Sequence, residues 1–107
     1  MVIETEIVDG ICILRPAERV DALTAPDLQA RLSQNLKEHT RVIFSGRSLD
    51  YLSSAGLRAL LVASRVEESQ LVLCELSPMV TKVMTVAGFH EILTIVPTES
   101  EALQAFS

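Results

Sequence analysis

The sequence predicts a single α/β domain whose mostly parallel sheet is opened by an antiparallel hairpin. Short apolar runs alternate along the chain with stretches of helical periodicity, a pattern typical of parallel strands joined by helices. An Asp-Gly pair separates the first two apolar runs, which is a strong signal for a hairpin. The 107 residues, 49% of them hydrophobic, suffice for one domain with one core.

The hairpin is expected at the start of the chain. Within residues 1–8, Ile3, Thr5 and Ile7 face one way and alternate with Glu4 and Glu6, and a second, apolar run covers residues 11–16. Asp9 and Gly10 stand between the two runs, where the tight turn needs positive φ angles.

A helix is expected after an irregular segment at residues 17–23. Thr24 can cap this helix, which extends to residue 39, and Pro26 suits its first turn. Every fourth residue is a leucine, and these leucines are expected to face the core: Leu28, Leu32 and Leu36.

The middle of the chain predicts a strand at residues 41–45, a helix at residues 54–68 and a strand at residues 71–75. The residues expected on the inner side of this helix are Leu57, Leu60, Leu61 and Ser64.

The last third predicts a helix at residues 77–88, a strand at residues 91–96 and a short final helix. Ser77 caps the first of these helices and Gly88 ends it, while Thr98 and Glu101 form a capping box for the second. Helical spacing places these apolar residues in the core: Met79, Val80, Val83, Met84 and Ala87.

Composition and charge exclude several classes of function. The formal net charge is -5 and the basic residues are scattered, which argues against nucleic acid as a partner. No apolar run approaches the roughly 20 residues of a membrane helix and no signal peptide is recognisable, so we expect a soluble, cytoplasmic protein without membrane insertion. Cys12 and Cys74 lie far apart in apolar runs, which favours buried reduced thiols over a metal pair or a disulfide.

The loop at residues 48–56 is the strongest candidate for a functional site. It is expected where a strand ends and a helix begins, at the edge of the sheet where α/β proteins commonly bind ligands. Ser54 in this loop has three interpretations. Its hydroxyl can cap the helix, act as a nucleophile, or accept a phosphate that the positive helix N-terminus tolerates.

A nucleophile has the least support among these three. The pattern G-x-S-x-G lacks its first glycine here, and neither His39 nor His90 has a recognisable partner. The sequence also shows no glycine-rich phosphate loop and no cluster of metal ligands. We therefore expect no enzymatic activity and no catalytic, cofactor or metal site.

The loop and its surroundings resemble a known family. The segment DYLSSAGLRALL, residues 50–61, is similar to the signature loop and helix of STAS domains, in particular those of bacterial anti-sigma factor antagonists. The similarity extends through RVDALTAPDL, residues 19–28, to TVAGFHEILTIVPTESEAL, residues 85–103. The resemblance implies that residues 1–107 form a single STAS domain.

The resemblance implies partner switching. In this family the serine at the position of Ser54 is phosphorylated by the anti-sigma factor, a serine kinase with an ATPase fold like that of histidine kinases. The unphosphorylated antagonist binds the anti-sigma factor and so frees a sigma factor. The phosphorylated antagonist is released, and a metal-dependent serine phosphatase resets it. By this analogy the chain needs no cofactor, and whether it forms a homodimer stays open.

The resemblance also implies roles for other residues. Asp21 corresponds to an acidic residue after the second strand, which shapes the loop or aids recognition by the kinase. Arg58 can pair with the phosphate. The residues expected at the partner interface are Asp21, Ser53, Ala55, Gly56, Leu57 and Arg58.

The sequence departs from the family pattern at two places. Ser53 stands where the family often has Asp, and residues 45–47 read Ser-Gly-Arg where Asp-Leu-Ser is common. The loop is therefore less acidic, which can change the kinase that accepts it, and Ser53 becomes a competing acceptor. Ser54 remains the expected acceptor because it directly precedes Ala55 and Gly56.

Other functions within the same family stay open. STAS domains also serve as subunits of lipid or solute ABC-type transporters, as parts of larger signalling scaffolds, and as small-molecule-binding modules. A switch antagonist is expected to have kinase and phosphatase genes as neighbours, whereas a transporter subunit is expected beside a permease and an ATPase.

Overall fold

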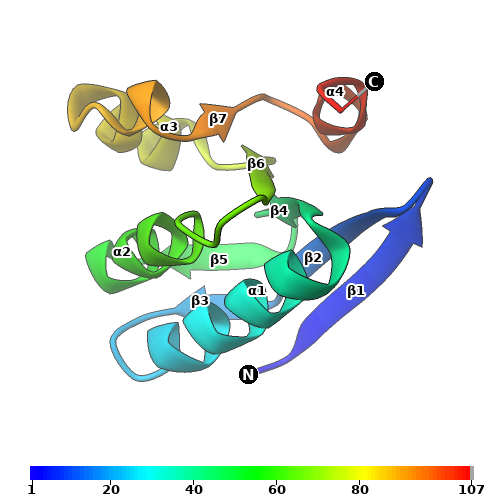
Figure 1. The fold of residues 1–107 in the computed structure, drawn as a ribbon. Helices are drawn as coiled ribbons and strands as arrows, with labels where there is room; N and C mark the ends of the chain where they lie inside the picture. The colour runs from blue at the N-terminus through cyan, green and yellow to red at the C-terminus, as the bar shows by residue number, and fades with distance from the viewer. Residues whose placement is uncertain (107) are drawn as a thin grey trace.

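In the computed structural model, which describes residues 1–106, the chain forms a five-stranded sheet with helices on both faces (Figure 1). The strand order is β1-β2-β4-β6-β7, and β1 (Ile3–Val8) is antiparallel to β2 (Ile11–Pro16). The strands β4 (Arg41–Ser45), β6 (Gln70–Cys74) and β7 (Thr94–Ile95) continue the sheet in parallel. The predicted fold class is confirmed.

The opening turn has the backbone that its sequence requires. Asp9 and Gly10 adopt positive φ angles of 51° and 79°, as in the type I′ turns that match the twist of paired strands. Val8 pairs with Ile11 directly before and after this turn. The predicted hairpin is therefore confirmed.

The two faces of the sheet carry two separate apolar clusters. One cluster packs under α1 (Ala25–His39), α2 (Ser54–Ala63) and α3 (Pro78–Val86). The other packs under α4 (Glu99–Gln104). The three leucines predicted to face the core are buried in the first cluster: Leu28, Leu32 and Leu36. Within residues 1–106 no helix has the length and apolar character needed to cross a membrane.

Two short strands lie in segments for which the sequence predicts no strand. β3 (Glu18–Val20) and β5 (Leu49–Leu52) pair in parallel and form a separate two-stranded sheet. Strands of three and four residues are too short to show the alternation that predicts a strand. This pair matters for function because it positions the predicted site loop.

The helix α2 is shorter than predicted and buries a different stripe of residues. It ends at Ala63, and Ser64 then donates its hydroxyl to the carbonyl of Leu61 (2.6 Å). Because its inner side consists mainly of small residues, α2 can pack closely on its neighbours. The buried residues are Gly56, Ala59, Leu60 and Ala63, whereas Leu57, Leu61 and Ser64 are only half-buried.

The helix α3 begins and ends as predicted, but it exposes most of its apolar side chains. The hydroxyl of Ser77 accepts from the N–H of Val80 (3.2 Å), and Gly88 follows the helix with a φ of 83°. Met84 is buried as predicted. The core prediction is wrong for Met79, Val83 and Ala87, which are exposed. The reason is the position of α3 in the fold. It lies beside the edge strand β7, so little of the sheet lies under these side chains to bury them (Figure 1).

The segment between α3 and α4 contains less strand than predicted. A 3-10 turn, η1 (Phe89–Glu91), takes its first part, and β7 has only two residues. Pro97, which has no N–H for a ladder, follows soon after. Thr98 caps α4 as predicted, accepting from the N–H of Glu101 (3.1 Å). Both cysteines are buried and free, as predicted: Cys12 and Cys74.

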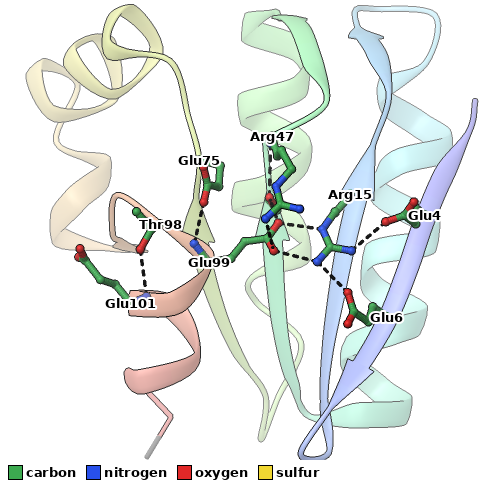
Figure 2. A network of polar contacts seen from close by, with 9 residues as sticks. Glu4, Glu6, Arg15, Arg47, Glu75, Thr98, Glu99 and Glu101 are labelled. Atoms are coloured by element: carbon green, nitrogen blue, oxygen red, sulfur yellow. Dashed lines mark hydrogen bonds and ion pairs between the residues drawn. The ribbon is translucent and has the colours of Figure 1, made fainter.

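A buried ionic network holds α4 against the sheet (Figure 2). Arg15 donates from Nε and Nη2 to the two carboxylate oxygens of Glu99, both at 2.8 Å. Ser45 donates its hydroxyl to the same carboxylate at 2.6 Å, and Arg47 lies 3.0 Å from it. Arg15 and Glu99 are each only 7% exposed. Two glutamates of β1 accept further hydrogen bonds from Arg15: Glu4 and Glu6.

This network predicts a loss of stability at acid pH. Hydrogen bonds from Arg15 lower the pKa of Glu99 from 4.5 to about 2. A carboxyl whose pKa is lower in the folded state stabilises the fold above its unfolded pKa, and this contribution disappears as the pH falls through the folded pKa. We expect the free energy of unfolding, measured by urea titration, to fall between pH 4.5 and about pH 2. The fall should be smaller in Glu99→Gln, and an equal fall in both proteins would show that other carboxyls cause it.

Candidate functional site

Two loops meet at the carboxyl ends of the parallel strands β3 and β5. Val20 and Leu52 are register partners at these ends, so the segments that begin with Asp21 and Ser53 lie beside each other. The N–H of Ser53 donates to the carbonyl of Val20 (2.8 Å), which ties the second loop to the first. The structure thus brings together two predicted site segments that are far apart in the sequence.

The two serines have different roles at the start of α2. Ser53 is the N-cap: its half-buried hydroxyl accepts from the N–H of Gly56 (3.3 Å). Ser54 is the first residue of the helix and is exposed. Among residues 1–106 its hydroxyl has no hydrogen-bond partner. The interpretation of Ser54 as the cap is therefore wrong, because the helix begins at Ser54 itself.

These roles predict different effects of two neighbouring substitutions. Ser53→Ala removes the cap and should lower the free energy of unfolding by about 1 kcal/mol. Ser54→Ala removes an exposed hydroxyl and should change it by less than about 0.5 kcal/mol. Urea denaturation followed by circular dichroism measures both values. A larger loss for Ser54→Ala than for Ser53→Ala would contradict this assignment of the cap.

Gly56 lets α2 begin close to the β3–β5 pair. It is buried, and a Cβ atom here would lie 2.5 Å from Leu52 Cδ1 and 2.7 Å from Val20 Cγ1. Leu52 can rotate its end away, but the β-branched side chain of Val20 is stiff. The lack of space for a Cβ atom therefore favours glycine at this position. Because glycine has no side chain, the loop with Ser53 and Ser54 can lie against the two strands.

We expect Gly56→Ala to lower the free energy of unfolding by about 1–3 kcal/mol, because the added methyl group overpacks a filled site. Urea denaturation measures the loss. The double variant Gly56→Ala/Val20→Ala tests the cause, since the new methyl group can occupy the space that Val20 leaves. Its loss should be smaller than the sum of the two single losses, and strictly additive losses would contradict a clash with Val20.

Asp21 shapes the loop that precedes α1. Its carboxylate accepts from the N–H groups of Leu23 (3.0 Å) and Thr24 (3.1 Å). These bonds, that of Thr24 first, lower the pKa of Asp21 below its ordinary 3.8. The hydroxyl of Thr24 accepts from the N–H of Asp21 (2.9 Å). Thr24 therefore stands at the predicted cap position but makes no capping bond with its side chain, because its hydroxyl is used within the loop.

The side chains of Arg19 and Tyr51 join the strands β3 and β5 just before the two loops, and sequence reasoning missed both residues. The guanidinium of Arg19 lies over the ring of Tyr51, 4.5 Å from its centroid. Its Nε atom is 3.8 Å from Asp21 Oδ2. Arg19 and Tyr51 are register partners in β3 and β5, and since neither strand was predictable, no pattern in the sequence pointed to this contact.

A shallow groove of about 350 Å³ lies between α1 and α2, and its lining includes Ala55, the residue that follows Ser54, but not Ser54 itself. Two predicted interface residues, Ala55 and Arg58, line it, and most of its other lining residues are small. Arg58 is exposed and makes no ion pair within residues 1–106. It follows Ser54 by one helical turn, so both side chains project from one side of α2. Leu57 is half-buried and packs against the core instead.

The site therefore combines an exposed hydroxyl, a neighbouring cation and a groove lined by small residues. No side chain in the described part of the chain accepts a hydrogen bond from Ser54. The arrangement suits modification by an external enzyme and contact with a partner.

Comparison with known proteins finds relatives along the whole chain. The family model of the STAS domain matches residues 2–102. BtrV of Bordetella bronchiseptica, named as a candidate anti-sigma factor antagonist, is 39% identical over 103 residues, which cover 92% of this chain and 89% of BtrV. An anti-sigma factor antagonist from Mycobacterium paratuberculosis has a similar structure, with a TM-score of 0.86, 20% identity, and coverage of 97% of this chain and 92% of that one. Bacillus SpoIIAA, solved in its phosphorylated form, has a TM-score of 0.72 and 21% identity, and the match covers 99% of this chain and 100% of SpoIIAA.

Proposed function

The chain belongs to the STAS domain family, and we propose that it is a phosphorylation-switched anti-sigma factor antagonist whose acceptor is Ser54. In the unphosphorylated state it binds an anti-sigma factor with serine kinase activity and thereby releases a sigma factor. A metal-dependent serine phosphatase restores this state after phosphorylation. The observation that carries the proposal is that Ser54 is exposed and its hydroxyl has no hydrogen-bond partner within residues 1–106. The resemblance of residues 50–61 to STAS domains matches this position to the acceptor serine of the family.

The position of Ser54 suits a phosphate. It stands at the start of a ten-residue helix, where free N–H groups and a partial positive charge favour an anion. A phosphate adds about -1.5 to -2 charges at pH 7, and Arg58 lies one helical turn away. Because Ser54 is exposed and its hydroxyl has no hydrogen-bond partner within residues 1–106, phosphorylation is expected to change the surface and leave the fold in place.

The groove between α1 and α2 supports a role in partner binding. Its small, mostly uncharged lining residues form a surface on which a partner can pack closely. A phosphate at Ser54 would add negative charge next to this surface, and a partner fitted to the neutral form would meet repulsion and a desolvation cost. The names of the relatives agree with this role, since BtrV and the Mycobacterium protein are named for anti-sigma factor antagonists.

Ser53 is the poorer acceptor of the two serines. Ser53 is half-buried and its hydroxyl caps α2, so a kinase would have to break this hydrogen bond and disturb the start of the helix. Ser54 requires neither change.

Mass spectrometry tests the proposal. The protein is incubated with ATP, Mg²⁺ and the candidate anti-sigma factor kinase from its own genome, and the tryptic peptide of residues 48–58 is then analysed. We expect one phosphate, which is absent in Ser54→Ala and retained in Ser53→Ala. Phosphate retained in Ser54→Ala would contradict the assignment. No phosphate with any such kinase would favour a STAS subunit of an ABC-type transporter or a signalling scaffold.

A further inference from the structure

We propose that the free edge of β5 and the start of α3 form a docking groove for an extended, basic segment of a partner protein. This β5 groove encloses about 170 Å³ and is lined by Gly46, Leu49–Leu52, Leu76, Ser77, Met79 and Val80. Its α3 side and its strand edge play no part in the proposed phosphorylation switch, so the inference does not rest on that switch.

The lining shows that the groove runs along the edge of β5. Successive residues of a strand point to opposite faces, so a cavity on one face touches only alternate residues. All four residues of β5 line this groove. The groove beside β1 is different, since it touches that strand only at the alternate residues Ile3 and Thr5. The β5 groove therefore adjoins the backbone of β5 along its whole length.

This edge of β5 has no strand partner in the described part of the chain. β5 pairs with β3 on one side, and the two strands form a sheet of their own. The backbone N–H and C=O groups that point away from β3 are therefore available to another extended chain. Adding a strand to such an edge is a common mode of peptide recognition.

The walls of the groove are apolar and partly open. Tyr51 is 46% exposed on the β5 side, and Met79 is 77% exposed on the α3 side. Leu49 and Leu52 are half-buried and pack on the core below. Sites for small molecules commonly enclose about 300–1,000 Å³, so this groove is too small for a cofactor and fits one or two side chains of a peptide.

Charge identifies the chemistry of the occupant. Asp50 is the one charged residue among those that line the groove. It is exposed and forms no ion pair within residues 1–106. An extended segment that places apolar side chains in the groove and a Lys or Arg beside Asp50 would satisfy both features. A strand of four residues offers few hydrogen bonds, so the complex should be weak and exchange rapidly.

Nuclear magnetic resonance with a defined probe tests the proposal. The ¹⁵N-labelled protein is titrated with the acetylated and amidated peptide Lys-Val-Lys-Ile-Lys-Val-Lys. We expect amide shifts confined to residues 46–52 and to residues 76, 77, 79 and 80, together with slower hydrogen exchange of β5 amides. The matched probe has the same sequence and charge but carries N-methyl groups on alternate residues, which block strand pairing. It should bind at least tenfold more weakly.

Two protein variants test the charge. Asp50→Lys changes an exposed residue of the groove and should weaken binding of the first peptide at least threefold. Glu67→Lys makes the same change at an exposed acid outside the groove and should leave binding within twofold of the unmodified protein.

Four results would overturn the proposal: equal binding of the N-methylated peptide, shifts spread over the acidic surface, no binding at millimolar peptide, or shifts of β5 amides on dilution of the protein alone. The last result would show that a second copy of the chain occupies the edge. No kinase and no phosphate enter this experiment, so its outcome is independent of the switch at Ser54.

Discussion

Replacing Glu99 with alanine is expected to lower the free energy of unfolding by about 3 kcal/mol, the largest change in stability predicted for this chain. The substitution removes the carboxylate that accepts two hydrogen bonds from Arg15, which is only 7% exposed. Losing one member of a buried ion pair commonly costs about 3–5 kcal/mol. The lower end of this range applies because Arg15 keeps Glu4 and Glu6 on its more exposed side.

Two further variants test whether burial causes this loss. Glu4→Ala removes a carboxylate from the same guanidinium, but the side chain of Glu4 is 71% exposed, so it should cost less than about 1 kcal/mol. The double variant Arg15→Met/Glu99→Leu leaves no unpaired charge in the buried part of the network, because the side chains of Glu4, Glu6 and Arg47, which lose their partners, are more than half exposed. It should therefore be more stable than Glu99→Ala. Urea denaturation measures all three, and similar losses for Glu4→Ala and Glu99→Ala would refute the role given to the buried pair.

A negative charge at Ser54 is expected to weaken binding to the anti-sigma factor at least tenfold. Ser54→Asp adds one charge directly before Ala55, which lines the groove between α1 and α2 where the proposed partner packs. Placing two like charges next to each other across an interface weakens the binding free energy by several kcal/mol. A phosphate carries more charge than Asp and more bulk, so Ser54→Asp sets a lower limit for the effect of phosphorylation.

Two matched variants test whether a charge weakens binding because it lies at position 54 or because it changes the net charge of the protein. Ser54→Ala should bind like the unmodified protein, because it keeps the loop small and neutral. Ser100→Asp adds the same charge to an exposed serine of α4, on the other face of the sheet, and should also bind normally. Surface plasmon resonance with immobilised anti-sigma factor measures the affinities. Equal weakening by Ser54→Asp and Ser100→Asp would mean that net charge, and not the site, controls binding.

Local signals in the sequence predicted the longer elements well. The hairpin follows from Asp9 and Gly10, whose positive φ angles the structure confirms. The helix α1 follows from leucines at every fourth position, and α3 from Ser77 and Gly88 at its two ends. These signals work because each depends on residues within one or two turns of backbone.

Features that depend on contacts between residues far apart in the sequence could not be predicted. β3 and β5 pair with each other across two other elements, and each is too short to show a pattern of its own. Periodicity marked Met79 and Val83 as apolar positions of a helix, but it does not tell whether a sheet lies beneath them. Arg15 and Glu99 form their pair across most of the chain, and in the sequence each is an ordinary charged residue.

In the candidate site too, local sequence signals were predictive and contacts between distant residues were not. The resemblance of residues 50–61 to STAS domains pointed to Ser54, and the structure adds that its hydroxyl is exposed and has no partner within residues 1–106. The capping role of Ser53 depends on where α2 begins, which sequence signals define only to within a residue or two. The contact of Arg19 with Tyr51 required the pairing of β3 with β5.

The most direct test of the proposed switch is a calorimetric titration of the purified anti-sigma factor with two forms of this protein. One form is unmodified, and the other is fully phosphorylated on Ser54, with its modification checked by mass spectrometry. We expect the unmodified form to bind in a defined ratio and the phosphorylated form to bind at least a hundredfold more weakly. Equal affinities for the two forms would contradict phosphorylation-controlled binding at Ser54.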